Sequence, residues 1–343
     1  MTAVVPPLLL HEKLGHGHFG TVYRGMDSVH GQVAVRVLTR RPEYNDQQWN
    51  RFKRGFLSEA QTLSKASHRN VVQVHHITEM PDGDSIYLCM AYCPGGSLQR
   101  LFELGPMTLS AVRKAGTEVL MGLGALHARG MLHRDIKPGN ILIDAAGVSQ
   151  LGDFGLVTDD LLLGYGSIAG YSDHIAIEVW RNNLTSAKSD IWALGMTLFR
   201  LLHGKSWYEQ APCPRDIIQA GGFAGTLRWL PHIPKIWRRV IRKMMADDTA
   251  ARYQSCSQAL GALSRLPVSP EWTTIVAPEL ICWEQQSRSR KSYVEWRRYS
   301  ERKHEWSAWS EPLGSGRRRT LGGSNGIIGR KQAVNELEAY FQS

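Results

Sequence analysis

Two short stretches of this chain carry side chains that could catalyse a phosphoryl transfer. The first is His133–Asn140, with the sequence His-Arg-Asp-Ile-Lys-Pro-Gly-Asn, and the second is Asp153–Gly155, with the sequence Asp-Phe-Gly. Transfer of a phosphoryl group needs a carboxylate that orients the attacking hydroxyl and oxygen ligands that hold Mg²⁺. Asp135 fits the first role, and Asn140 and Asp153 fit the second. The two stretches together therefore predict a phosphoryl-transfer site.

A glycine-rich stretch near the amino terminus could cover the phosphates of a nucleotide. Gly15, Gly17 and Gly20 occur in the pattern Gly-x-Gly-x-Phe-Gly-x-Val, between segments whose alternating residues predict two strands. Glycine allows the backbone to approach phosphate groups closely. On its own the pattern would fit an ordinary hairpin turn equally well. The motifs further along the chain favour the phosphate-binding interpretation.

The order and form of these motifs resemble the eukaryotic-like (Hanks-type) Ser/Thr protein kinases. The resemblance covers residues 8–266. It implies an α+β, bilobal protein-kinase fold, with a small β-rich N-lobe at 8–90, a hinge at 91–96 and a larger helical C-lobe at 97–266. Residues 267–343 are expected to form a small basic, Trp-rich C-terminal appendage.

We call His133–Asn140 the catalytic stretch, and the resemblance implies roles for several polar residues in and after it. Asp135 would act as the base or orienter of the substrate hydroxyl, and Lys137 would stabilise the phosphate that moves. Asn140 and Asp153 would hold Mg²⁺. Lys137 is typical of the Ser/Thr-specific members, which implies protein substrates that carry a Ser or Thr acceptor, including the chain itself. ATP and Mg²⁺ are the expected cofactors.

The nucleotide site that the resemblance implies draws residues from both lobes. It comprises the loop glycines, apolar residues that would sandwich the adenine, a gatekeeper, and hinge residues whose backbone would face the adenine edge. In that order, these residues are Gly15, Gly17, Gly20, Val22, Ala34, Leu142, Met90, Ala91 and Cys93. The apolar residues would fit plain core positions equally well. The Cys93 thiol could be reactive, or it could be buried and inert.

Arg36 departs from the family pattern at a position that matters for ATP binding. It ends the string Val-Ala-Val-Arg, where the family has a lysine that pairs with the α/β-phosphates and with a helical glutamate. Apolar residues at helical spacing predict a helix from Phe52 to Ala66, and Glu59 lies in it where the resemblance places that glutamate. Arginine keeps the charge, but its planar fork places the donors differently. Two alternatives follow: a kinase whose activity Arg36 could impair, and a weak or inactive pseudokinase scaffold that binds nucleotide and a partner.

Other positions of the resemblance concern control and stability. The activation loop would run from Leu156 to Ile175. Its hydroxyl-bearing residues are Thr158, Ser167, Tyr171 and Ser172, of which Ser167 and Ser172 rank first as phosphorylation sites. Asp190 is expected to brace the backbone of the catalytic loop, and Arg252 is placed to pair with Glu178.

Composition bounds the class of protein. With 343 residues, of which 43% are hydrophobic, the chain exceeds the usual size of one domain and can bury a core. No apolar run approaches the roughly 18 residues of a membrane span, and the start lacks a secretion signal. We expect a cytoplasmic protein without a membrane partner, similar to soluble bacterial or phage-encoded kinases. The five scattered cysteines are expected to be reduced, and the histidines outside the catalytic loop show no transition-metal spacing.

The C-terminal stretch concentrates positive charge and tryptophan. Residues 283–331 hold 12 Lys and Arg against 5 Glu, within a net charge of +10. Five tryptophans in 272–309 would be costly to expose to water, so we expect a folded appendage of strand-like segments and a short helix at 333–341. Two interpretations stay open: a structural cap with a solvated basic face, or a surface for single-stranded nucleic acid. Thr320, after Arg317–Arg319, is a candidate for self-phosphorylation.

Overall fold

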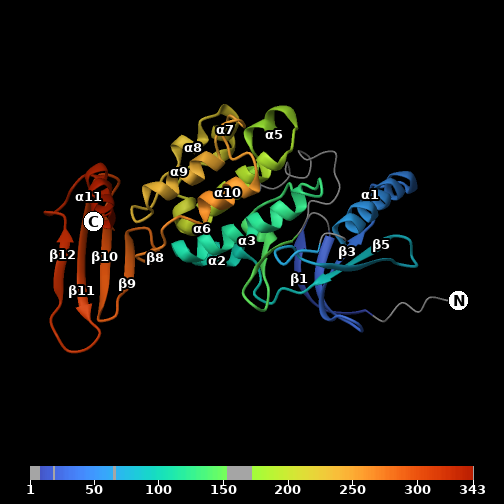
Figure 1. The fold of residues 1–343 in the computed structure, drawn as a ribbon, viewed down its shortest axis with the longest axis horizontal. Coiled ribbons are helices and arrows are strands. Elements are labelled where there is room, and N and C mark those ends of the chain that lie inside the picture. Colours follow the sequence, from blue (N-terminus) through green and yellow to red (C-terminus); the bar gives the residue numbers. More distant parts are fainter. Residues whose placement is uncertain (1–7, 18–19, 65–66, 153–171, 343) are drawn as a thin grey trace.

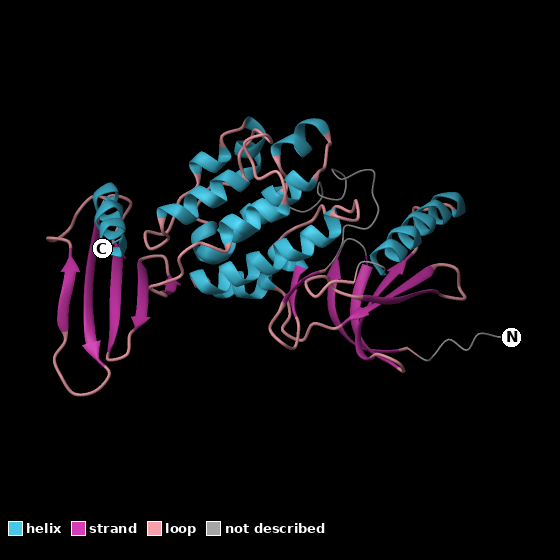
Figure 2. Cartoon of the chain, in the orientation of Figure 1, coloured by secondary structure: helices cyan, strands magenta, loops and turns pink. Residues whose placement is uncertain are grey.

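The computed structural model describes residues 8–17, 20–64, 67–152 and 172–342. These residues form three parts in chain order: a sheet with one helix (the N-lobe), a helical body (the C-lobe), and a second sheet with one helix (the C-terminal sheet). The two sheets lie at opposite ends of the helical body (Figure 1). Figure 2 shows how helices fill the middle of the molecule and strands its ends. The two-lobed α+β fold predicted from the sequence is confirmed.

Among the described residues, the N-lobe is built on a five-stranded antiparallel sheet in the order β1-β2-β3-β5-β4. Its strands are β1 (Leu9–Gly17), β2 (Gly20–Asp27), β3 (Gly31–Thr39), β4 (Val74–Glu79) and β5 (Ser85–Ala91). Successive side chains of a strand point to opposite faces. Val33 and Val35 therefore pack with Cys89 on one face, which we call the outer face, whereas Ala34 and Leu38 join the main core on the other.

Helix α1 (Asp46–Ser64) covers the core side of this sheet (Figure 1). Phe56 and Ala60 are fully buried and Trp49 is nearly so, as expected for apolar residues that recur on one side of a helix. The Trp49 indole Nε1 also donates a hydrogen bond to the Gly83 carbonyl at 2.7 Å. The start of the helix is thereby fixed to the turn between β4 and β5.

This helix begins at Asp46, earlier than the predicted start at Phe52. The reason is a reciprocal cap at its first turn. Asn45 Oδ1 accepts the backbone N–H of Gln48 at 2.8 Å, and Gln48 Oε1 accepts the backbone N–H of Asn45 at 3.0 Å. Such a pair satisfies two of the N–H groups that a helix end leaves without partners.

The C-lobe is mainly helical. Its elements are α2 (Leu98–Leu104), α3 (Leu109–His127), η1 (Pro138–Asn140), β6 (Ile141–Ile143), β7 (Ser149–Leu151), η2 (Ser172–His174), α5 (Ile177–Asn182), α6 (Ala187–Tyr208), α7 (Pro214–Ala220), α8 (Phe223–Thr226), α9 (Lys235–Met244) and α10 (Cys256–Leu263). Among the helices in the described ranges, none combines a membrane-spanning length with sufficient hydropathy.

Helix α6 forms the centre of the C-lobe. Its first turn is capped reciprocally, because Ser189 N donates to Ser186 Oγ at 3.4 Å and Ser186 N donates to Ser189 Oγ at 2.8 Å. Ile191, Leu194 and Leu201 are fully buried. Since α6 is surrounded by the core along most of its length, the position of its amino-terminal turn is fixed by packing. That turn carries Asp190.

Among the described residues, the chain after α10 forms an antiparallel sheet in the order β12-β11-β10-β9-β8, with helix α11 packed against it. The elements are β8 (Thr273–Val276), β9 (Leu280–Gln286), β10 (Arg290–Arg298), β11 (His304–Pro312), β12 (Arg319–Gly323) and α11 (Arg330–Gln342). Trp283, Trp296 and Trp306 are buried together on one face of this sheet. The tryptophan content thus provides the core of this part.

The C-terminal sheet is attached to the C-lobe by specific polar contacts. The Trp283 indole Nε1 donates to His232 Nδ1 at 2.9 Å, and Arg298 donates to the Gln210 side chain at 2.8 Å. On α11, the Glu338 carboxylate pairs with the guanidinium of Arg238, which belongs to α9. The appendage is therefore folded, as its composition predicted, and it contacts the C-lobe through these pairs.

The Arg238–Glu338 pair should contribute measurably to stability. The Arg238 side chain is 10% exposed and that of Glu338 is 20% exposed. Glu338→Gln would leave a largely buried cation without its counter-charge, so we expect the free energy of unfolding to fall by about 2–4 kcal/mol, between the values for exposed and buried pairs. Urea denaturation measures this change.

The matched control is Glu209→Gln. The Glu209 carboxylate lies 3.8 Å from Lys205 in an exposed pair, so its removal should change stability by less than about 0.5 kcal/mol. Equal effects of the two substitutions would contradict the structural role of the Arg238–Glu338 pair.

Candidate active site

The catalytic stretch lies between α3 and β6 and brings three predicted residues into contact. The Lys137 ammonium donates to Asp135 Oδ2 at 2.7 Å, and the Asn140 amide Nδ2 donates to the same oxygen at 2.7 Å. Asn140 Nδ2 also lies 2.8 Å from the backbone carbonyl of Asp135. The Asp135 side chain is 13% exposed. Its carboxylate is thus held by two donors and still reachable from solvent.

The carboxylate of Asp190 holds the backbone at the start of this stretch. Its Oδ2 accepts the backbone N–H of His133 at 3.0 Å, and its Oδ1 accepts that of Arg134 at 2.8 Å. Arg134 has a φ of +67°, a region that residues with a Cβ rarely adopt and that costs about 1–3 kcal/mol. The two hydrogen bonds to a charged acceptor offset this strain.

A third donor to Asp190 comes from the end of α3. His127 Nε2 lies 2.8 Å from Asp190 Oδ2, and Cys256 Sγ lies 3.3 Å from His127 Nδ1. Burial lowers the pKa of His127, but the hydrogen bonds to Asp190 and Cys256 outweigh it and raise the pKa to about 9. His127 is therefore an imidazolium at neutral pH, paired with the residue that braces the catalytic stretch.

Asp153, Phe154 and Gly155 lie outside the described residues, but the residue before them is fixed next to the catalytic stretch. The Gly152 backbone N–H donates to the Asn140 carbonyl at 2.9 Å. On its other side, His133 Nε2 lies 3.1 Å from the Gly152 carbonyl oxygen. Gly152, the last described residue before Asp153, therefore lies directly beside Asn140.

The glycine-rich stretch joins β1 to β2, as predicted. Gly15 lies opposite Val22 in the ladder, and Gly17 lies opposite Gly20. Gly20 has a φ of +114°, and a Cβ at this position would lie 2.2 Å from the Val37 carbonyl oxygen. Glycine is therefore required at position 20 for the sheet itself, in addition to any role towards phosphate.

Arg36 lies in β3 on the core side of the N-lobe sheet. Its cross-strand neighbours are Val22 and Leu88, and it is only 6% exposed. Ala34, two residues earlier, lies on the same side opposite Met90. The structure therefore places Val22, Ala34 and Arg36 on one face of the sheet. The backbone of Glu59 lies in α1, but its side chain is outside the described part of the structure.

The neighbouring lysines do not take the place of the family lysine. The Lys53 ammonium pairs with Glu79 and lies 3.2 Å from the Gly83 carbonyl, at the turn between β4 and β5. Lys13 lies on β1 opposite Tyr23 and is exposed. Arg36 is therefore the cation that β3 itself supplies to its face of the sheet.

The hinge connects β5 to α2. Ala91 lies opposite Val33 and donates its backbone N–H to the Gln73 carbonyl at 2.9 Å. Cys93 is buried, its carbonyl accepts the Gly96 N–H at 3.1 Å, and burial raises the pKa of its thiol to about 11. Of the two interpretations of Cys93, the structure supports the buried, inert thiol.

Leu142, the predicted C-lobe side of the adenine site, lies in β6. A Cβ on Gly152 would lie 3.1 Å from Leu142 Cδ1, so the Leu142 side chain packs beside the residue that precedes Asp153. Leu142 also forms a bridge with Ser97 at the end of the hinge. The structure thus links Leu142 to the hinge and to the catalytic stretch.

Glu178 and Arg252 form a bidentate ion pair, as predicted. The two guanidinium nitrogens lie 2.6 and 2.7 Å from the two carboxylate oxygens, and the Arg252 side chain is fully buried. Fork-to-fork pairs of this kind fix both partners in orientation. The pair anchors α5, which follows residues 153–171 and the short η2.

A buried cluster that the sequence did not indicate lies just before α5. Tyr208 Oη donates to Asp173 Oδ2 at 2.5 Å, and Arg200 NH1 lies 2.6 Å from His174 Nε2. Burial lowers the pKa of His174 well below its ordinary value, so its imidazole is neutral. The available signal was the position of Asp173 and His174 a few residues before Glu178, the predicted partner of Arg252. Of the predicted phosphorylation sites, Thr158, Ser167 and Tyr171 are outside the described residues, as is the side chain of Ser172.

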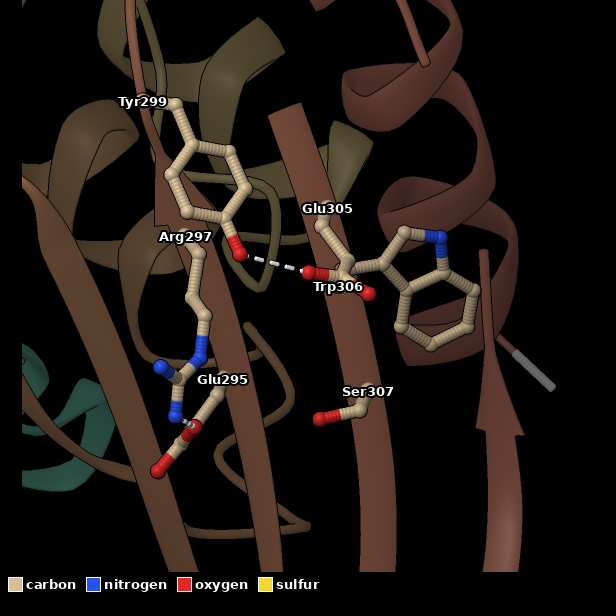
Figure 3. Close-up of a pocket in the computed structure, with 6 residues that line it drawn as sticks. All are labelled: Glu295, Arg297, Tyr299, Glu305, Trp306 and Ser307. Carbon is tan, nitrogen blue, oxygen red and sulfur yellow. Dashed lines mark hydrogen bonds and ion pairs between the residues drawn. The ribbon is translucent and has the colours of Figure 1, made fainter. Parts of the chain in front are cut away.

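A small hollow of about 280 Å³ lies on the C-terminal sheet, away from these residues (Figure 3). It is lined by Glu295, Arg297, Tyr299, Glu305, Trp306 and Ser307. Arg297 pairs with Glu295 at 2.9 Å, and Tyr299 Oη donates to Glu305 at 2.6 Å. Its charged groups thus bond to each other, and we assign no ligand to it.

The fold has two lobes, and the catalytic stretch lies in the C-lobe. The family model of the protein kinase domain matches residues 8–262, which is most of the chain. The chain belongs to the protein kinase family, and the family predicted from the motifs is confirmed.

Curated relatives include three bacterial Ser/Thr protein kinases. PrkC of Bacillus subtilis is 30% identical over 250 residues, which cover 71% of this chain and 38% of PrkC. PknL of Mycobacterium tuberculosis is 34% identical over 201 residues (57% and 49%), and the DNA damage-responsive kinase RqkA of Deinococcus radiodurans is 29% identical over 282 residues (76% and 39%). The matched region spans less than half of the length of each of these proteins.

The pKa of His127 predicts how stability depends on pH. Because the folded-state pKa of about 9 exceeds the ordinary value of 6.5, the stabilisation is complete below pH 6.5 and is lost as the pH rises through about 9. His127→Gln should remove this dependence, which amounts to up to about 3 kcal/mol. Denaturant unfolding at pH 6.5 and 9.5 measures it.

The exposed histidine of β1 provides the control. His11→Gln should leave the wild-type difference between the two pH values unchanged. Parallel pH profiles for the wild type and His127→Gln would contradict the assigned pairing with Asp190.

Proposed function

We propose that this chain transfers the γ-phosphoryl group of ATP to Ser or Thr hydroxyls of protein substrates, including its own. The observation that carries the proposal is the carboxylate of Asp135, held by the side chains of Lys137 and Asn140 on a braced loop. The relatives named as Ser/Thr protein kinases support the acceptor class. In the same proposal, residues 8–266 are the kinase domain and 267–343 its extension.

The roles of the residues follow from their chemistry. Asp135 would accept the hydrogen bond of the substrate hydroxyl and orient it for attack. Lys137 would place positive charge beside the phosphate that moves, because its ammonium lies at the same carboxylate. The brace by Asp190 would hold both groups in one geometry, so that little reorganisation is needed when the substrate binds.

The donor set fits Mg²⁺. Asn140 Nδ2 donates to Asp135, which leaves the amide oxygen Oδ1 as the ligand atom that Asn140 offers. An amide oxygen and the carboxylate of Asp153, which follows the fixed Gly152, are hard oxygen ligands of the kind that Mg²⁺ prefers. When bound, MgATP supplies the phosphoryl group and offsets the charge of its oxygens.

The nucleotide would lie against the core-side face of the N-lobe sheet. Gly15, Gly17 and Gly20 would cover its phosphates from the β1–β2 connection. Val22, Ala34 and Leu142 would sandwich the base, and the backbone of Ala91 and Cys93 would face its edge. Arg36, with Glu59 as its partner, would order the α/β-phosphates. The shared face of Val22, Ala34 and Arg36 supports this placement.

The alternative is the pseudokinase scaffold, and the observation behind it is Arg36, which stands where the family has a lysine. The contacts of Asp135, Lys137 and Asn140 support catalysis. In the C-terminal part, Trp283, Trp296 and Trp306 are buried and cannot stack on bases. Their burial favours the structural cap.

Asp135→Asn should separate catalysis from binding. The amide cannot accept the hydroxyl proton, so we expect the rate of Ser/Thr phosphorylation to fall by about 10²–10⁴-fold, while the dissociation constant for ATP stays within a few-fold of the wild type. Labelling of the chain and of a basic peptide with γ-labelled ATP measures the rate, and calorimetry measures binding. Undiminished labelling by Asp135→Asn would refute the assigned role.

Arg36 can be tested by removing and by restoring the family side chain. Arg36→Met should lower kcat/KM for ATP by about 10–100-fold, because it deletes a charged hydrogen-bond donor. Steady-state kinetics with varied ATP, beside Arg36→Lys, measures this. If Arg36→Lys phosphorylates substrate and the wild-type chain does not, this chain is a disabled kinase. If neither the wild type nor Arg36→Lys does so, the scaffold is favoured.

A further inference from the structure

Three strands of the N-lobe bring together a carboxylate, an imidazole and a thiol. Asp27 ends β2, His76 lies in β4 and Cys89 lies in β5. One ligand atom of each lies within 4.8 Å of those of the other two. We propose that Asp27, His76 and Cys89 form a binding site for a divalent transition-metal ion of the zinc class.

The sheet itself sets this geometry. His76 and Cys89 are directly opposite each other on the neighbouring strands β4 and β5. Asp27 Oδ2 lies 2.9 Å from His76 Nε2. Zinc bonds of about 2.0–2.3 Å place neighbouring ligand atoms of a tetrahedral site about 3–4 Å apart. Small side-chain rotations therefore suffice to bring the three atoms onto one ion.

The carboxylate of Asp27 is oriented before any ion binds. Its Oδ1 accepts the backbone N–H groups of Val29 and His30 at 2.9 and 2.8 Å, within the turn between β2 and β3. The other oxygen, Oδ2, is thereby directed at His76. Hydrogen bonds of this kind to a ligating group orient it and are a regular part of metal sites.

Burial and access suit a bound ion. Asp27 is 4% exposed and Cys89 is fully buried, whereas the His76 side chain is 35% exposed. Two ligands thus come from a water-poor interior, and the third faces the surface by which an ion would arrive.

A further imidazole lies next to the three ligands. The ring of His30 is 6.4 Å from that of His76, and it stacks on His75 at 3.9 Å. His30 follows the turn that Asp27 holds, so rotation of its side chain could supply the fourth ligand of a tetrahedral site, with water as the alternative.

The donor set selects the class of metal. Thiolate and imidazole donors favour Zn²⁺ and related transition metals, whereas Mg²⁺ and Ca²⁺ favour oxygen donors alone. The site also differs in position from the proposed nucleotide site. Cys89 packs on the outer face of the N-lobe sheet, while its neighbour Met90 joins the core side. The ion would tie β2, β4 and β5 together across the outer face.

Spacing along the chain could not reveal this site. Its residues are separated by 49 and 13 positions, and the histidines outside the catalytic loop show no transition-metal spacing. The three side chains meet only because β5 lies between β3 and β4 in the sheet.

Titration with Co²⁺ tests the proposal, because a thiolate bound to Co²⁺ gives a charge-transfer absorption band. The purified full chain would carry Cys213→Ala, which removes an exposed thiol. We expect one Co²⁺ per chain with a thiolate band, displaced by Zn²⁺. Cys89→Ala should lose the band, and His76→Gln should bind at least about tenfold more weakly, as expected for loss of a metal ligand.

The control is His11→Gln, an exposed histidine of β1, which should bind as the parent chain does. Absence of a thiolate band in the parent chain would overturn the proposal, and so would a band that persists unchanged in Cys89→Ala. His76 is partly exposed, so His76→Gln should fold, and unchanged affinity in this variant would also overturn the proposal. None of these readouts depends on kinase activity.

Discussion

The candidate active site depends on the hydrogen bonds that the Asp190 carboxylate accepts from the backbone of His133 and Arg134. Helix α6 is buried along most of its length, so the core of the C-lobe fixes Asp190, and Asp190 in turn fixes the backbone of His133 and Arg134. The strained φ of Arg134 then turns the chain so that Asp135 meets Lys137 and Asn140. The packing of many apolar residues around α6 thereby fixes the position of the Asp135 carboxylate.

The parts that could be predicted from the sequence are those that nearby residues determine. Asp135, Lys137 and Asn140 lie within six positions, and the structure joins them by direct hydrogen bonds. The predicted short helix at 333–341 corresponds to α11. The tryptophans of residues 272–309 predicted a folded C-terminal part, because so much apolar surface must be buried somewhere.

The parts that were missed depend on residues far apart in the chain. The partner of Asp173 is Tyr208, that of Glu338 is Arg238, and no local pattern marks either pair. The start of α1 was placed too late because its cap is Asn45 with Gln48, whereas the apolar period becomes regular only later. Contacts of this kind form only when helices and strands pack together, so the spacing of residues along the sequence does not predict them.

We propose that this chain moves the γ-phosphoryl group, and not another part of ATP, onto protein hydroxyls. The most direct test is to incubate the wild-type chain and a protein substrate with ATP labelled either at the γ- or at the α-phosphorus, followed by phosphoamino-acid analysis. The proposed transfer predicts label on Ser or Thr from γ-labelled ATP alone. Label from α-labelled ATP, or no label from either, would contradict it.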